Sequence, residues 1–126
     1  RYRTLIEFLP IGIGVHCEGK LVFVNSAACR IMGAEAPEQL LGRNVLDFVA
    51  PEFQKSVVNR IGRMMKGERV PHLEEKFVRL DGQLIDVEVY GYPYEYKGKP
   101  AVQIIVRDIT GQKMAEEAVL KNEVLF

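Results

Sequence analysis

The sequence predicts an α+β domain built on a five-stranded antiparallel sheet, with short helices on one face of the sheet and a helix at each end of the chain. Three observations indicate this class. Two strands come first (11–24), a run of short helical segments follows (25–66), and a three-stranded meander closes the domain (77–110). Short turns join the strands within each group, which requires antiparallel pairing. The helices must then cover the one face of the sheet that is apolar.

The meander carries the clearest strand signal, an alternation of apolar and polar residues. In its middle strand Ile85, Val87 and Val89 face one way and Asp86, Glu88 and Tyr90 the other; in its last strand Val102, Ile104 and Val106 share one face. Asp81-Gly82 predicts a tight turn in which both positions accept positive φ. The turn at Gly98 is expected to be wider.

The first two strands predict a second hairpin, 11–17 and 21–24, joined by a turn at Glu18-Gly19-Lys20. Along the first strand, Ile11, Ile13, Val15 and Cys17 alternate with Gly12, Gly14 and His16. Because His16 lies opposite the Ile/Val side, we expect it at the surface or in a dimer interface.

The middle block predicts short helices followed by one longer helix. Asn25 is a good N-cap for a helix over 26–32. Shorter helical turns are expected over 37–42 and 45–48, and the longest helix begins at Pro51. The apolar stripe of this longest helix consists of Phe53, Val57, Ile61 and Met64 or Met65.

Both ends of the chain are expected to be helical: a short amphipathic helix over 1–9, and a longer one that follows Thr110 as its cap. The apolar residues of the first helix, Leu5, Ile6 and Leu9, offer a dimer contact. The second helix ends in mid-pattern, so we expect the chain to be a piece of a longer protein. The sequence thus divides into a domain over 1–110 and the start of a linking helix over 111–126.

The composition is that of an ordinary globular domain and argues against several function classes. The 126 residues include 17 basic and 17 acidic side chains, whereas nucleic acid binding needs a surplus of Lys and Arg. No apolar run reaches the roughly 18 residues of a membrane span, so no membrane contact is expected. Cys17 and Cys29 lack metal-binding spacing and are expected as buried or half-buried thiols in a reducing cytoplasm. We therefore expect a cytoplasmic domain without a metal site.

No set of residues predicts catalysis. Asp86 and Glu88 share one strand face, but it is the polar face, so we expect them in solvent, together with Glu74 and Glu75. His72 is expected as an ordinary residue at the start of a strand. The alternative is a small stand-alone α+β enzyme with Asp86, Glu88 or His72 as acid and base, which predicts an open polar pocket around these residues.

A cavity between sheet and helices would take its walls from the long helix and the inward side of the sheet. The candidate wall residues are Val45, Phe48, Val57, Val58, Ile61, Met65, Val87, Val89, Ile104 and Val106. These walls are apolar with few polar groups, so they would suit a small hydrophobic or aromatic ligand, or be filled by side chains.

Four short motifs occur in order along the chain: GKLVFVNSAA at 19–28, LGRNV at 41–45, LDG at 80–82 and RDIT at 107–110. In this order and at these intervals they resemble the PAS sensory domain, over about Leu5 to Thr110. The resemblance implies a five-stranded antiparallel sheet whose helices enclose a ligand-sized cavity. It also implies a C-terminal helix that passes a signal to an output domain, such as a histidine kinase or a cyclic-di-nucleotide enzyme.

Departures from the cofactor-binding members of this family leave no cofactor favoured. Val45 stands where the photosensing flavin-binding members carry a reactive cysteine, and Val106 where they carry a glutamine. Val58 stands at the position of the haem-ligating histidine, and the long helix contains no histidine. The alternative is a sensor that holds haem through an unforeseen ligand, or flavin noncovalently.

The residues and the resemblance together predict a non-catalytic sensory and dimerisation module of a larger bacterial signalling protein. We expect a homodimer, a covalently linked output domain and a small hydrophobic ligand. Asp108, Ile109 and Thr110 join the last strand to the exit helix with almost no slack, so this junction is expected to carry the signal.

Overall fold

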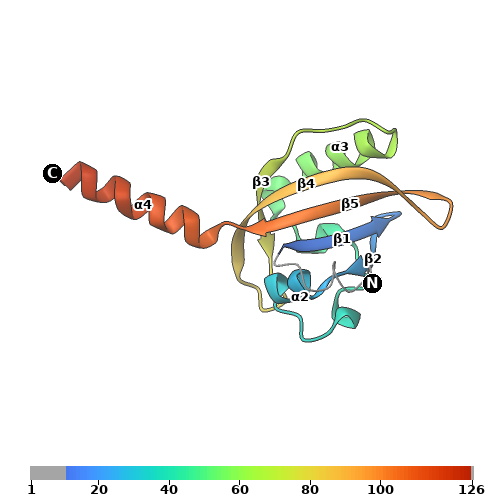
Figure 1. Ribbon diagram of the computed structural model, residues 1–126, viewed down its shortest axis with the longest axis horizontal. Coiled ribbons are helices and arrows are strands. Elements are labelled where there is room, and N and C mark those ends of the chain that lie inside the picture. Colours follow the sequence, from blue (N-terminus) through green and yellow to red (C-terminus); the bar gives the residue numbers. More distant parts are fainter. Residues whose placement is uncertain (1–10, 126) are drawn as a thin grey trace.

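The structure, a computed structural model, describes residues 11–125. Within this range the elements are β1 (Gly12–Cys17), β2 (Lys20–Val24), α2 (Ser26–Met32), the 3₁₀ helices η1 (Pro37–Gln39), η2 (Val45–Phe48) and η3 (Pro51–Phe53), α3 (Gln54–Met65), β3 (Leu73–Val78), β4 (Leu84–Tyr96), β5 (Lys99–Asp108) and α4 (Thr110–Leu125). The five strands form one antiparallel sheet in the order β2-β1-β5-β4-β3 (Figure 1). The predicted α+β class is confirmed, whereas the helix predicted over 1–9 lies outside the described residues.

The widths of the two meander turns are the reverse of the prediction. Lys97 and Gly98 form a two-residue turn in which both φ angles are positive, 49° and 77°. Asp81 and Gly82 lie inside a five-residue loop, and of the two only Gly82 has positive φ, 85°. The Asp81 carboxylate accepts a hydrogen bond from the amide of Gln83 at 3.0 Å, so this side chain stabilises the loop locally instead of occupying a tight turn.

Asn25 connects β2 to α2 and is the predicted helix cap. Its side-chain oxygen accepts hydrogen bonds from the amides of Ile13 and Ala28, each at 2.9 Å, and its side-chain nitrogen donates to the carbonyl of Ile11 at 2.9 Å. The side chain is fully buried. One residue therefore fixes both the start of the helix and the neighbouring strand β1. Gly33 ends the helix in the left-handed conformation, with φ 71°.

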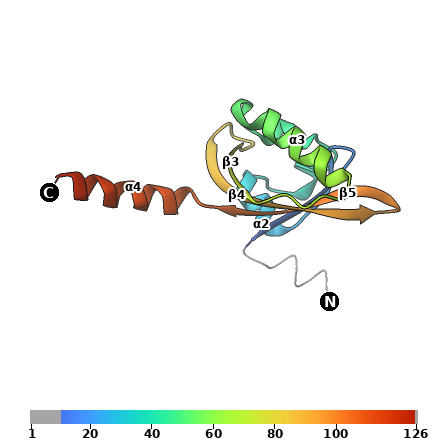
Figure 2. The same cartoon turned by 90° about the horizontal axis from the view of Figure 1, so that it is seen from above.

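The segment around η2 ties the two edges of the sheet together. Asn44 pairs with Lys20 on the β2 edge, and Val49 pairs with Phe77 on the β3 edge. With its two bridges to the edge strands, this segment crosses one face of the sheet from edge to edge, so both edges are covered. Figure 2 shows that the sheet curves around the helices on this face.

The helices lie on the concave side of this curled sheet, as Figure 2 shows for α3, and the main core lies between the two layers. The core consists of Leu21, Val24, Cys29, Met32, Leu40, Phe48, Val49, Phe77, Ile85, Val87, Val89 and Val106. A smaller cluster of Val15, Cys17 and Ala101 lies apart from it. Cys17 and Cys29 are both buried, as predicted.

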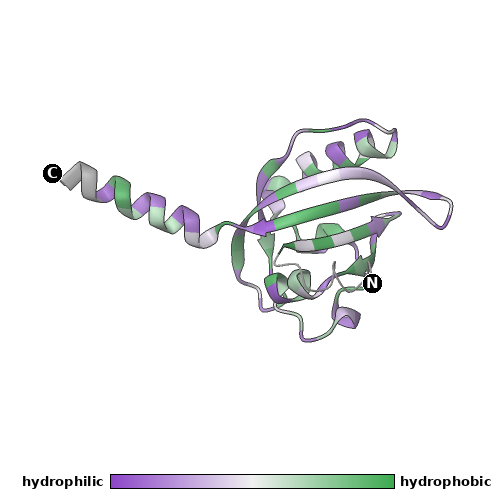
Figure 3. Ribbon diagram, in the orientation of Figure 1, coloured by the Kyte–Doolittle hydropathy of each residue, from purple (hydrophilic) through white to green (hydrophobic). Residues whose placement is uncertain are grey.

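Helix α4 projects away from the sheet (Figure 1). It begins at Thr110, two residues before the predicted start, because the Asp108 carboxylate accepts a hydrogen bond from the Thr110 amide at 2.9 Å and caps the helix. Figure 3 shows hydrophobic residues interspersed with hydrophilic ones along it, and Met114, Val119 and Leu120 are exposed. Among the described helices, none combines the length and the apolarity that a membrane span needs.

Candidate functional site

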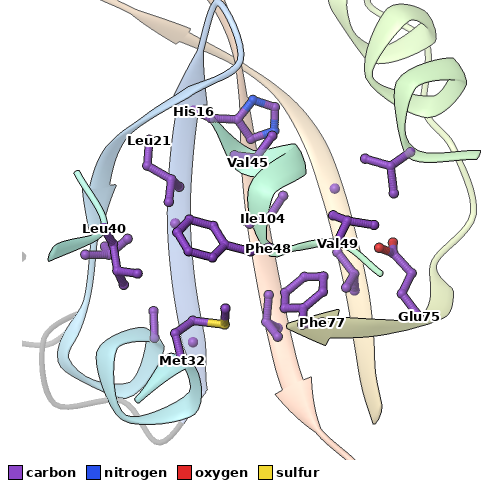
Figure 4. Close-up of a pocket in the computed structure, with 18 of the residues that line it drawn as sticks. His16, Leu21, Met32, Leu40, Val45, Phe48, Val49, Glu75, Phe77 and Ile104 are labelled. Carbon is purple, nitrogen blue, oxygen red and sulfur yellow. The ribbon is translucent and has the colours of Figure 1, made fainter. Parts of the chain in front are cut away.

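A cavity of about 90 Å³ lies between the concave face of the sheet and the helices (Figure 4). All five strands contribute to its wall, together with α2, α3 and the 3₁₀ helix η2. One water needs about 10–15 Å³ of cavity volume, so the cavity holds roughly six to nine waters. A ligand that fills it would have about as many non-hydrogen atoms. Its wall is predominantly apolar.

Seven predicted wall residues line the cavity: Val45, Phe48, Val57, Ile61, Val89, Ile104 and Val106. Val58 does not, and is 52% exposed, because the inward side of α3 repeats through positions 57, 60, 61 and 64. Met65 does not line the cavity either, because it lies one position beyond Met64, which is on the inward side and does line it. Val87 is fully buried in the core but does not reach the cavity.

Sequence reasoning missed most of the wall that comes from the first hairpin and from α2. The apolar and glycine wall residues missed, in these and other elements, are Gly12, Gly14, Leu21, Val24, Ala28, Ile31, Met32, Leu40, Val49, Phe77 and Gly91. The cause is the orientation of β1, whose small-residue side faces the cavity while Ile13 and Val15 face the other way. The glycines themselves were the available signal, because a missing side chain on the inward face of a strand leaves space.

Glu75 is a buried carboxylate in the cavity wall, so the prediction that it is solvated was wrong. It is only 4% exposed and shares the inward face of β3 with Phe77 (Figure 4). Burial raises the pKa of Glu75 to about 7, and the positive charge of Arg60 on α3 opposes that rise. The period of two along a strand could have found it, since Phe77 was an obvious core residue two positions away.

His16 is also buried in the wall, on the β1 side, so its prediction at the surface or in an interface was wrong. It is 3% exposed, and the pairing of β1 with β2 shifts register between Val15 and His16. Burial lowers the pKa of His16 to about 4, so the imidazole is neutral at pH 7. A neutral imidazole offers one hydrogen-bond donor and one acceptor.

The residues of the enzyme alternative lie on the other face of the sheet, away from the cavity. Asp86 pairs with Lys76 at 2.9 Å, Glu88 pairs with Arg107 at 3.2 Å, and the His72 side chain is half exposed. The cavity therefore brings none of these three candidate acids and bases together. Among the side chains that the structure describes, those of residues 11–121, no group of His, Cys, Asp and Glu has a metal-binding arrangement.

The junction between β5 and α4 is anchored to the backbone of one β4 residue, Asp86. The amide of Ile109 donates to the Asp86 carbonyl at 2.9 Å, and the Thr110 hydroxyl accepts from the Asp86 amide at 3.0 Å. Ile109 is itself buried, and Asp108 supplies the cap described above. All three predicted junction residues thus hold the first turn of α4 against the sheet.

Comparison with known proteins gives two relatives that are much longer than this chain. A family model described as PAS domain matches residues 10–111. Sporulation kinase A of Bacillus subtilis is 34% identical over 121 residues, which is 96% of this chain and 20% of that protein. The C4-dicarboxylate transport sensor protein DctS of Rhodobacter capsulatus is 33% identical over 94 residues, or 72% of this chain and 14% of that protein. The chain thus spans a fifth or less of the length of these relatives.

Solved structures resemble the fold over most of the chain. The PAS domain of an HTR-like protein from Haloarcula marismortui superposes with a TM-score of 0.72 and 26% identity, covering 86% of this chain and 89% of that one. A PAS domain from Colwellia psychrerythraea has a TM-score of 0.76 and 17% identity, covering 87% of this chain and 95% of that one. The second likeness concerns the fold alone.

Proposed function

This chain belongs to the PAS domain family, and we propose that it is the ligand-sensing and dimerisation module of a larger cytoplasmic signalling protein, without catalysis of its own. A small apolar molecule occupies the cavity, and its binding changes the position of α4 relative to the sheet. The linked output domain then responds to that change. A ligand shifts this equilibrium only by the difference between its affinities for the two states.

The observation that carries this proposal is the short path from the cavity to the exit helix. Ile104 and Val106 of β5 line the cavity, and Asp108 begins the junction two residues later, about 7 Å along the strand. The next two residues are bonded to β4, which supplies another part of the wall. A displacement of β5 against β4 therefore acts directly on the first turn of α4.

Exposed apolar residues of α4 support dimerisation and a linked output domain. Met114, Val119 and Leu120 are each more than half exposed on a helix that leaves the sheet. A second copy of the same helix would cover the adjacent pair Val119 and Leu120, whereas Met114 lies on a different side of the helix. Its described ionic contacts with the sheet are made by Lys113, with Glu74 at 3.0 Å and with Asp86 at 4.0 Å. Surface ion pairs of this kind contribute little free energy, so beyond its anchored first turn the helix can move with its partner.

The geometry does not favour the haem or flavin alternative. A cavity with room for roughly nine atoms is too small for a porphyrin or an isoalloxazine ring. The inward positions of α3 supply Val57, Arg60, Ile61 and Met64. Of these four side chains, only that of Met64 is of a type that serves as an axial ligand of haem iron. We therefore propose a small ligand and no resident cofactor.

Toluene, a small apolar probe, tests whether the cavity binds ligands. A Cβ atom added at Gly91 would lie 2.7 Å from Sδ of Met64, so Gly91→Val pushes this side chain into the cavity. At tenfold excess over its dissociation constant, toluene stabilises the wild type by about 1.4 kcal/mol and raises Tm by about 4 °C. The same addition leaves the Tm of Gly91→Val unchanged.

The matched control for this experiment is Gly62→Ala. Gly62 lies on α3, where an added Cβ meets nothing within 4 Å, so this variant retains the full toluene shift. Absence of a shift in the wild type, or an equal shift in Gly91→Val, contradicts ligand binding in the cavity.

A further inference from the structure

The carboxyl group of Glu75 is an unpartnered polar group at the boundary of an apolar cavity. It is 4% exposed, and Figure 4 shows it at the cavity wall beside Val49 and near Phe77. It forms no hydrogen bond or ion pair with another described residue, although the charge of Arg60 acts on it from α3. Buried polar groups in folded proteins are nearly always hydrogen-bonded. The missing partner is therefore to be sought in what occupies the cavity.

The charges around Glu75 restrict what this partner can be. A cationic ligand group would be repelled by Arg60, and an anionic one by Glu75 in its ionised form. A neutral group leaves the charge balance between these two side chains unchanged. Because burial brings the pKa of Glu75 to about 7, the carboxyl group exists at neutral pH in both protonation states. A hydroxyl group bonds to either state, since it has one donor and two acceptor positions.

We propose that the cavity takes a small neutral molecule with an apolar body and a single hydroxyl group, a phenol or a compact alcohol, and that this hydroxyl bonds to the Glu75 carboxyl. This inference rests on the proposed ligand-binding function and adds the chemical class of the ligand. The apolar body lies against Phe48, Phe77 and Val89, which line the same cavity.

His16, the other buried polar side chain of the wall, lies on a different side of the cavity from Glu75 (Figure 4). It belongs to β1, and β5 and β4 separate that strand from β3. A ligand whose single hydroxyl group bonds to Glu75 therefore makes no use of His16.

Phenol and toluene test the inference, because they share size and shape and differ in the hydroxyl group. In isothermal titration of the wild-type protein at pH 7, phenol binds about tenfold more tightly than toluene, which is the factor that one hydrogen bond to a buried carboxyl contributes. Benzylamine and benzoate, a cation and an anion with a similar body, bind more weakly than phenol. The ¹³C signal of the Glu75 carboxyl shifts on addition of phenol and stays in place on addition of toluene.

Two variants assign this preference to one side chain. Glu75→Met keeps the volume but removes the hydrogen bond, so phenol and toluene bind it equally, and unchanged toluene affinity shows that its cavity is intact. Glu74→Met is the matched control, because Glu74 is the adjacent glutamate, is exposed and does not line the cavity. It retains the tenfold preference.

The outcomes separate the inference from the proposed function. If neither phenol nor toluene binds the wild type, the ligand-binding function itself fails. If toluene binds as tightly as phenol, if benzylamine or benzoate binds best, or if phenol leaves the Glu75 signal in place, the cavity binds ligands but the hydroxyl assignment is overturned. A phenol preference that survives Glu75→Met overturns it as well.

Discussion

Asn25→Ala lowers the free energy of unfolding by about 3 kcal/mol or more, because the buried side chain forms three hydrogen bonds at 2.9 Å. Alanine leaves the amide of Ile13 and the carbonyl of Ile11 without these partners and removes the cap from Ala28. Each buried group left unpaired costs about 1–3 kcal/mol. Urea denaturation of the wild type and the variant measures this loss of unfolding free energy, provided that both proteins have the same m-value.

Asn44→Ala is the control for this prediction. Asn44 caps η2 with one hydrogen bond, from the amide of Leu46 at 2.9 Å, and it lies in an exposed position. Its loss costs about 1 kcal/mol or less. If Asn25→Ala cost no more than Asn44→Ala, the role assigned to Asn25 in joining helix and strand would be wrong.

The second large effect is a pair of opposing pH dependences from Glu75 and His16. Folding raises the pKa of Glu75 from 4.5 to about 7, so the folded state holds the proton more tightly and stability falls as pH rises through this range. Folding lowers the pKa of His16 from 6.5 to about 4, so stability rises with pH between these values. Each shift corresponds to about 3 kcal/mol at most. In the wild type the two slopes largely cancel between pH 4.5 and 6.5.

Single variants separate the two contributions. Relative to wild type, Glu75→Gln gains stability progressively from pH 4.5 to 7, because the penalty of ionising the buried carboxyl is gone. His16→Gln gains stability relative to wild type as pH falls from 6.5 to 4. The measurement is the free energy of unfolding in urea across this pH range. Difference curves that are flat for both variants would show that the two groups are not buried as described.

Local patterns were sufficient to predict the fold. Alternation in the meander, the cap at Asn25 and the short turns depend on neighbours in sequence, and the antiparallel sheet with helices on one face followed from them. The seven apolar wall residues were predictable for the same reason, since the inward side of a strand or helix is read from its period. The turn widths were not, because the Asp81 side chain bonds within its own loop.

The polar part of the cavity wall could not be predicted from polarity alone. Glu75 was assigned to the surface because charged side chains are usually exposed, and His16 to the surface or an interface because it lies opposite the Ile/Val side of β1. The structure places both on the inward face of the sheet. On β1 the Ile/Val side looked like the core side, and only the curl of the sheet shows that the glycine side faces the cavity. Register and curvature depend on segments distant in sequence, such as the η2 crossing that joins the sheet edges.

The central claim is that occupancy of the cavity reaches α4 through the junction, and amide NMR spectra of the wild type and of Thr110→Val test it most directly. Valine keeps the shape of threonine but removes the hydroxyl that bonds to the Asp86 backbone. We predict that toluene shifts the amide signals of residues 109–113 in the wild type, and that in Thr110→Val it shifts only those of the cavity wall. Wild-type shifts confined to the cavity wall, or shifts at 109–113 that persist unchanged in the variant, would contradict the account.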